Sequence, residues 1–256
     1  MEPHHPHHLT HKKKWGEYLL EFFMLFFAVF LGFVAENIRE NIVEKQRETQ
    51  YVFGFVQDLK SDSTLLNRQI KLNLIKELEF DSLLKMKHTD LSNQDNIRKV
   101  YSYFSRGSGY PIFTPSDATI SQLKNGGAFR LIKKNVSDSI LAYDNFNKEI
   151  ITHNDQYLKV HNEFWDETYN IIDVSIFRDT NFLPHDQYFG MSLVYYSLIW
   201  KNSRLPLISS NKKDKQRFFG LLMRLLSFNG ANRHRMIQQK ERAVRLILFL
   251  NKEYHL

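Results

Sequence analysis

The longest apolar run in the chain extends from Leu19 to Ala35, and Glu21 is its only charged residue. As an α-helix these 17 residues span about 26 Å, slightly less than a bilayer hydrocarbon core of about 30 Å. Trp15 and Tyr18 precede the run, where interfacial aromatic side chains belong, and Glu21 is close enough to the end to reach headgroups. The pattern predicts a transmembrane helix over residues 17–37.

Two alternatives to a membrane anchor were weighed on the same residues. A cleaved signal sequence fits less well, because the only suitable junction, after Ala35, has the bulky Phe33 where a small residue is wanted. The second alternative, a buried helix of a soluble domain, is not excluded by these residues. We therefore expect an uncleaved signal anchor that crosses the membrane once.

Small and acidic residues gather on one face of this predicted helix. At about 100° per residue, Glu21, Ala28, Gly32 and Ala35 point the same way, whereas most of the phenylalanines occupy the opposite side. Ala28 and Gly32 have the small-xxx-small spacing that lets two membrane helices approach closely. We interpret these four residues as a packing face for a homo-oligomer, the alternative being that any apolar helix of this length contains some small residues.

The basic residues beside the predicted span bear on its orientation. Lys12, Lys13 and Lys14 are contiguous before the span, whereas Arg39, Lys45 and Arg47 after it are dispersed among glutamates. Since Lys and Arg are retained on the cytoplasmic side, this favours an N-terminus inside. We expect a bacterial inner (cytoplasmic) membrane protein whose C-terminal domain lies outside the cytoplasm.

Helical periodicity continues after the span. Apolar residues recur mostly at steps of three, four or seven, and no proline occurs between Pro6 and Pro111. The sequence predicts a stalk helix over residues 38–90, with Gly54 and the Ser61–Ser63 cluster as points that bend or interrupt it. A helical bundle domain over residues 91–256 follows, into which the stalk packs.

Capping and stop signals divide the bundle domain into elements. We expect helices from the capping box of Ser92 and Asp95 to Phe104, from Thr114 to a stop at Asn125–Gly127, from Asn135 to about Phe177, from Gln187 to Asn202, and from Asn211 to Tyr254. The last of these has Asn229 and Gly230 as its weak point.

Composition agrees with this reading. The 256 residues contain only 10 Gly and 6 Pro but 21 Phe and 12 Tyr, a balance that favours long helices over a turn-rich β fold. Cysteine is absent, which excludes disulfides, thiolate catalysis and thiolate metal sites. The predicted fold is all-α: an N-terminal transmembrane helix that continues into a stalk and an antiparallel helical bundle.

Charge is concentrated at the C-terminal end. The segment from Lys201 to Leu256 contains 13 Lys and Arg and three acidic residues, which gives it a net charge of +10. Since the whole chain has a net charge of +7, the rest of the chain carries −3. Such a basic end suits an anionic lipid, a cell-wall polymer or an acidic protein, and equally a merely solvated face. Nucleic acid ranks behind these, because no recognised binding module is present. The candidate patch consists of Arg233, Arg235, Lys240, Arg242 and Arg245.

One regular line of polar residues falls within the predicted helix that starts at Asn135. Its members are spaced by seven and share a face: Asn147, Asn154, His161, Thr168 and Ser175. They suit either a polar groove or, more commonly, hydrogen-bonded positions in a packed core.

Motifs for catalysis are absent: the chain has no HExxH, GxSxG, Walker lysine loop or Rossmann glycine fingerprint. The N-terminal tail, residues 1–16, carries His4, His5, His7, His8 and His11, a tract that chelates metal in some proteins but also matches an expression tag or a flexible tail. We predict no catalytic residue, no cofactor and no metal site.

Three segments together resemble a known family: EFFMLFFAVFLGFVAENIRE, YVFGFVQDLKSD and TPSDATISQLKNGGAFRLIKKNVSDSILAYD. They are similar to an uncharacterised family of single-span membrane proteins with a helical C-terminal domain, found in Bacteroidota. The resemblance covers most of the chain and implies an anchor and a helical domain, without a catalytic residue or cofactor. We expect a membrane-anchored helical interaction module, a scaffold or sensor. The alternative is a tethered enzyme or nucleic-acid-binding protein whose site no motif reveals.

Overall fold

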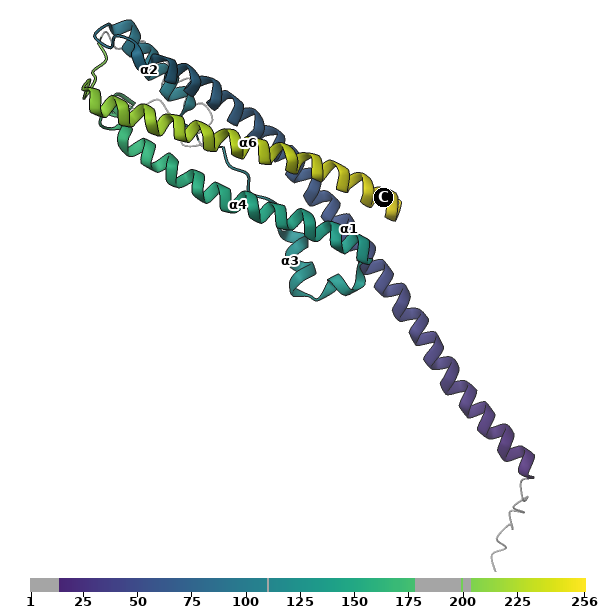
Figure 1. Ribbon diagram of the computed structural model, residues 1–256. Helices are drawn as coiled ribbons and strands as arrows, with labels where there is room; N and C mark the ends of the chain where they lie inside the picture. Colours follow the sequence, from purple (N-terminus) through teal and green to yellow (C-terminus); the bar gives the residue numbers. More distant parts are fainter. Residues whose placement is uncertain (1–13, 110, 178–198, 200–203) are drawn as a thin grey trace, which may run out of the picture. The chain divides into compact units, whose positions relative to one another are not determined.

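The structure is a computed structural model that describes residues 14–109, 111–177, 199 and 204–256. Its helices are α1 (Trp15–Lys85), α2 (Gln94–Gly107), α3 (Ala118–Asn125), α4 (Lys134–Thr168) and α6 (Lys212–Tyr254), with short 3-10 turns at Met86–His88, Ala128–Leu131 and Val174–Phe177 (Figure 1). Over the described residues, β pairing is limited to one isolated bridge between Ile172 and Leu207. The all-α prediction is confirmed.

The chain divides into two compact units, Met1–Tyr51 and Val52–Leu256. Helix α1 contributes to both, so the predicted stalk, residues 38–90, is shared between them.

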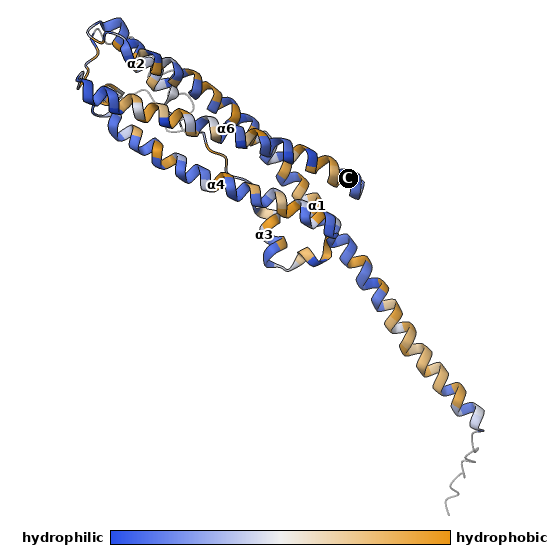
Figure 2. Ribbon diagram, in the orientation of Figure 1, coloured by the Kyte–Doolittle hydropathy of each residue, from blue (hydrophilic) through white to orange (hydrophobic). Residues whose placement is uncertain are grey.

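Unit 1 consists of the N-terminal part of α1, and Figure 2 shows a nearly continuous hydrophobic run along it. The predicted span is helical throughout, and none of its most apolar 18-residue window is buried. Phenylalanine rings stack along the helix, with centroids 6.3 Å apart for Phe22 and Phe26 and 6.0 Å for Phe26 and Phe30. Among the described helices, α1 is the one long and apolar enough to cross a membrane.

Unit 2 packs three long helices side by side: residues 52–85 of α1, α4 and α6 (Figure 1). Helix α6 is antiparallel to α4, since Arg217 pairs with Glu167 while Gln239, further along α6, bonds Asn147, earlier in α4. Helix α4 runs parallel to α1, as the pairs Asp62–Tyr143 and Phe80–Phe164 show. The predicted antiparallel bundle therefore contains one parallel pair.

A parallel pair requires the chain to return from the far end of α1 to the start of α4. We call the described residues of this connection, 108–109 and 111–117, the return segment, and they belong to no helix or strand. Gly109 lies beside Lys76, Pro111 beside Asn73 and Ser116 beside Asp62, so the return segment follows α1 backwards. From Lys76 to Asp62 α1 rises by about 21 Å at ~1.5 Å per residue, a distance that the seven steps from 109 to 116 cover at ~3.3 Å each.

The return segment is also part of the core. Phe113 is fully buried in a cluster with Leu66, Phe146, Ile150 and Met236. A second, larger cluster lies around Phe80, Phe104, Phe164 and Phe218, drawing on α1, α2, α4 and α6. Burial of the apolar surface of these two clusters is the main favourable contribution to folding of unit 2.

Several predicted boundaries were wrong because their partners are distant in sequence. Helix α1 is unbroken at Gly54 and at Ser61–Ser63. The cap of α2 is Asn93, not Ser92; the Asn93 side chain accepts from Asp95 N, whereas Ser92 donates to Asp90. Helix α3 starts at Ala118 rather than after Thr114, because Asp58 and Asp62 of α1 accept from the amides of Thr119 and Ser116.

Of the remaining boundaries, the end of α3 and the start of α6 were predicted correctly, whereas the end of α4 was not. Helix α3 ends at Asn125, and Gly127 takes the left-handed conformation (φ 61°) that favours glycine. Helix α6 is capped by Asn211, whose side chain accepts from Asp214 N at 2.8 Å, although it shows no break at Asn229 and Gly230. Helix α4 ends at Thr168, short of the expected Phe177. The helix predicted for residues 187–202 lies almost wholly outside the described residues.

Candidate functional site

The five basic residues of the predicted patch on α6 do not form one surface. Arg233 forms an ion pair with Glu77 of α1, and Lys240 donates to Asn67 Oδ1 at 2.8 Å. Arg235 donates to the carbonyl of Ala231 in its own helix. Arg242 and Arg245 are exposed. The structure therefore assigns two of the five to contacts with α1 and leaves Arg242 and Arg245 available to solvent.

These two arginines line a shallow groove between α4 and α6, with a volume of about 270 Å³. Its other lining residues are Ser139, Ala142, Tyr143, Leu246 and Phe249. The guanidinium of Arg242 lies over the ring of Phe146, 4.1 Å from its centroid, which holds the side chain in place by a cation–π contact. Arg245 forms a long ion pair with Glu241, with 3.8 Å between Nη1 and Oε2. Within the described part of the chain, Arg242 forms no ion pair.

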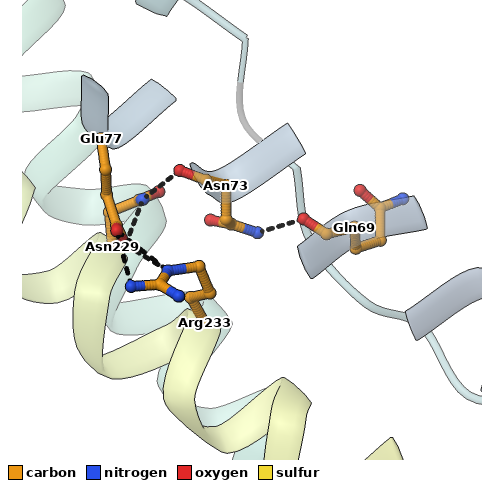
Figure 3. A network of polar contacts seen from close by, with 5 residues as sticks. All are labelled: Gln69, Asn73, Glu77, Asn229 and Arg233. Carbon is orange, nitrogen blue, oxygen red and sulfur yellow. Dashed lines mark hydrogen bonds and ion pairs between the residues drawn. The ribbon is translucent and has the colours of Figure 1, made fainter. Parts of the chain in front are cut away.

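The contact between α1 and α6 is a polar network (Figure 3). Arg233 Nε donates to both Glu77 oxygens at 2.9 Å, and Asn229 Nδ2 donates to Glu77 Oε1 at 3.2 Å. Asn229 Nδ2 also donates to the Asn73 carbonyl at 3.0 Å, and Asn73 Nδ2 to the Gln69 carbonyl at 2.9 Å. The side chains of Glu77 and Arg233 are only 16% and 30% exposed, so this is a partly buried charge pair.

Four of the five residues of the predicted polar line, Asn147, Asn154, His161 and Thr168, lie on α4 and are buried. Asn147 accepts from Gln239, and Asn154 accepts from Asn232 while it donates to the Phe113 carbonyl. The Thr168 hydroxyl donates to the Phe164 carbonyl. Ser175 lies beyond α4 and is exposed. Since none of these residues lines the groove of Arg242 and Arg245, the packed-core interpretation of the line is favoured over a polar cavity.

Lys76 is the most unusual polar residue of the interior. It is 3% exposed, and its amine donates to the carbonyl of Gly109 in the return segment. The nitrogen lies 5.1 Å from the Phe80 ring centroid and 5.5 Å from that of Tyr157. Burial lowers the pKa of Lys76 from its ordinary value to about 7.

Two titratable groups of α4 face this lysine. Burial, and then the charge of Lys76, lower the pKa of His161 to about 4, and Trp165 Nε1 donates to His161 Nε2 at 2.9 Å. Burial raises the pKa of Tyr157, which is fully buried. Near neutral pH both groups are therefore uncharged, and Lys76 is the group that changes its charge.

A second buried ionisable group holds the other end of the return segment. Asp62 is 2% exposed and accepts from Ser116 N at 2.7 Å and from the Tyr143 hydroxyl at 2.9 Å. Burial raises the pKa of Asp62, although both of these hydrogen bonds oppose the shift. Burial and the Asp62 carboxylate raise the pKa of Tyr143. The arrangement is a structural clamp on the amides before α3.

The four residues of the predicted membrane packing face, Glu21, Ala28, Gly32 and Ala35, are exposed on unit 1. A Cβ atom built on Gly32 meets nothing within 4 Å. A larger side chain at this position is therefore compatible with the helix itself.

Sequence reasoning missed Asn73 and Lys76, although a signal was present. Both occupy the stripe of α1 on which Leu66, Phe80 and Leu83 are buried, so they interrupt an apolar line at helical spacing. A metal centre finds no support in the described residues, where no group of three His, Asp or Glu side chains comes together. The histidine tail, residues 1–13, lies outside them.

Comparison of the chain with family models, with curated proteins and with solved structures gave no match. The resemblance to the Bacteroidota membrane family therefore stays an interpretation of the sequence.

Proposed function

We propose that this protein is a single-pass, membrane-anchored interaction module of the bacterial inner membrane, a scaffold or sensor rather than an enzyme. The observation that supports it best is the apolar stretch of α1, whose most apolar 18-residue window is not buried at all and needs an apolar surrounding. Unit 2 supplies a packed helical body with a basic helix on it. In its described part the interior is filled mainly by hydrophobic side chains, together with buried polar ones such as Asn147 and Asn154 that bond to their neighbours.

The first prediction concerns topology. The lysines before the span favour a cytoplasmic N-terminus and hence a unit 2 outside the cytoplasm. A periplasmic reporter such as alkaline phosphatase fused after Leu256 should be active, and external protease should digest unit 2 in spheroplasts. An inactive reporter with protected unit 2 would reverse the orientation and bring cytoplasmic partners, including nucleic acid, back into consideration.

The second prediction concerns self-association through the packing face. Gly32→Leu should reduce dimer cross-linking of the full-length protein in membranes by several-fold, because the larger side chain keeps two helix backbones apart. Gly16→Leu is the matched control, since Gly16 is equally open and lies before the apolar run. Equal cross-linking of the wild type and both variants would show that self-association does not use the face that contains Gly32.

The groove of Arg242 and Arg245 is the part of unit 2 best suited to an anionic partner. Arginine pairs donate several N–H groups in a fixed geometry and bind carboxylate or phosphate in a bidentate manner. Helix α6 as a whole carries 11 Lys and Arg and three acidic residues, so its field attracts anions. Leu246 and Phe249 add an apolar floor beside the charges.

The third prediction tests this groove with heparin as the anionic probe. The full-length protein in detergent micelles should bind a heparin column, and Arg242→Gln with Arg245→Gln should weaken binding roughly tenfold and lower the eluting salt concentration. Lys212→Gln with Lys213→Gln removes the same charge from exposed positions of α6 outside the groove. Equal losses in the two double variants would show general charge attraction instead of a groove site.

A further inference from the structure

The two arginines of the groove between α4 and α6 carry N–H groups that the protein itself does not use. Neither Arg242 nor Arg245 donates a hydrogen bond to another described residue. The guanidinium of Arg242 lies 4.1 Å from the ring centroid of Phe146, and a guanidinium that rests on a ring keeps its in-plane N–H groups for other acceptors. The groove therefore presents donors that lack an acceptor among the described residues.

The spacing of the two arginines matches a pair of carboxylates on a helix. Arg242 and Arg245 are three positions apart on α6, a separation at which the Cβ atoms lie about 5–6 Å from each other. Two acidic residues three or four positions apart on another helix have the same spacing. Each guanidinium is thus placed to bind one carboxylate in a bidentate manner.

The walls of the groove suit the body of a helix. On α6 the lining positions from Arg242 to Phe249 recur at steps of three and four, so they form one face about 10 Å long. On α4 Ser139 and Ala142 are small, which leaves room for a backbone to approach. Leu246 and Phe249 offer apolar surface to an anchoring side chain, as in other grooves that bind amphipathic helices.

The exposed positive charge at the groove is short rather than continuous. Arg233 and Lys240 precede the groove on α6, but they are bound to Glu77 and Asn67 of α1. Anionic membrane surfaces are typically recognised by clusters of roughly four to eight Lys and Arg. Two arginines beside an apolar floor are a better match for a partner that combines two charges with an apolar side chain.

We propose that the groove between α4 and α6 binds an acidic amphipathic helix of a partner protein. Two carboxylates one turn apart pair with Arg242 and Arg245, and an apolar side chain of the same helix packs against Leu246 and Phe249. This inference rests on the proposed function, because it names the class of anionic partner that the same groove receives.

Fluorescence anisotropy of the full-length protein in detergent micelles tests the inference with a synthetic peptide as the probe. The labelled peptide is about 18 residues long, which is enough for a helix, and has glutamates at i and i+4 and leucines at i+3 and i+7. Replacing both glutamates by glutamine, or both leucines by serine, should weaken binding at least about tenfold. These comparisons use the wild-type protein throughout.

Ala142→Trp places the binding in the groove. The larger side chain fills the groove without changing its charge and should weaken peptide binding about tenfold. Thr152→Trp is the matched control, because Thr152 is exposed on α4 and does not line the groove. Equal affinities of the wild type and both variants would show that the peptide binds elsewhere and would overturn the inference.

Other occupants give different results. If the protein binds heparin but not the peptide, the inference is wrong and the proposed anionic partner remains. If the serine peptide binds as tightly as the leucine peptide, the contact is general charge attraction, which also contradicts the inference. If dihexanoylphosphatidylglycerol displaces the labelled peptide as well as the unlabelled peptide does, the groove is a lipid site and not a protein-docking site.

Discussion

Glu77→Ala is expected to lower the free energy of unfolding of unit 2 by about 3 kcal/mol. The substitution leaves the partly buried guanidinium of Arg233 without its carboxylate and removes an acceptor from the Asn229 amide. Breaking one side of a buried pair costs more than the pair contributes, because the remaining charge stays desolvated. Thermal or denaturant unfolding of the full-length protein in micelles, followed by circular dichroism, measures the loss.

Glu241→Ala is the matched control for this prediction. Glu241 also faces an arginine of α6, but the pair is 3.8 Å long and both side chains are more than half exposed, so the change should stay within about 0.5 kcal/mol. Adding Arg233→Met to Glu77→Ala should restore part of the lost stability, since no charge is then left unpaired. Equal losses for Glu77→Ala and Glu241→Ala would contradict a structural role of the network.

A count of charges along the sequence does not show which arginines of α6 are paired and which are exposed, and the network around Glu77 explains why. The patch on α6 was predicted from a local excess of Lys and Arg, and the excess is real. Whether an arginine meets solvent or a carboxylate depends on which helix packs beside it. Glu77 lies 156 positions before Arg233, so nothing near Arg233 in the sequence announces the pair. Arg242 and Arg245 differ from Arg233 only in facing the groove with α4.

Features set by local chemistry were predictable. The apolar run at residues 19–35, the Asn211 cap of α6 and the glycine stop after α3 each depend on a few consecutive residues. The line of polar residues spaced by seven along α4 was also recognisable as a shared face. Its burial, however, required knowledge of Gln239 and Asn232 on the opposite helix.

Features set by distant partners were not predictable in the same way. Thr114 and Pro115 form a good helix start by local rules, yet Asp58 and Asp62 of α1 accept from amides that follow them, and α3 begins only at Ala118. In the same way, nothing near Lys76 in the sequence distinguishes it from an exposed helical lysine. Its burial depends on the Gly109 carbonyl and the Tyr157 ring, which lie far from it in the sequence. In both cases tertiary contacts override the local preference.

Lys76 also makes global stability depend on pH, and the sign follows from its pKa values. The pKa of Lys76 is about 7 in the folded protein and near 10.5 in an unfolded chain. Between these values the unfolded chain binds the proton and the folded protein does not. The contribution of Lys76 to stability is therefore fully present above about pH 10.5, is lost as the pH is lowered toward 7, and changes little below that. The loss at pH 7 is roughly 4 kcal/mol. The lowered pKa of His161 acts in the same direction, but between about pH 6.5 and 4.

The effect of Lys76→Met on the free energy of unfolding should accordingly depend on pH. The substitution removes the proton-linked cost, but it also removes the hydrogen bond to the Gly109 carbonyl, a loss of about 1–2 kcal/mol. At pH 7 the variant should be about 2–3 kcal/mol more stable than the wild type, and near pH 9.5 the difference should fall to about zero. Lys71→Met, at an exposed position, should show no such convergence. Denaturant unfolding of the full-length proteins at pH 7, 8 and 9.5 measures the three differences. A variant that is less stable than the wild type by the same amount at every pH would mean that Lys76 titrates normally and that its amine is hydrated in the folded protein.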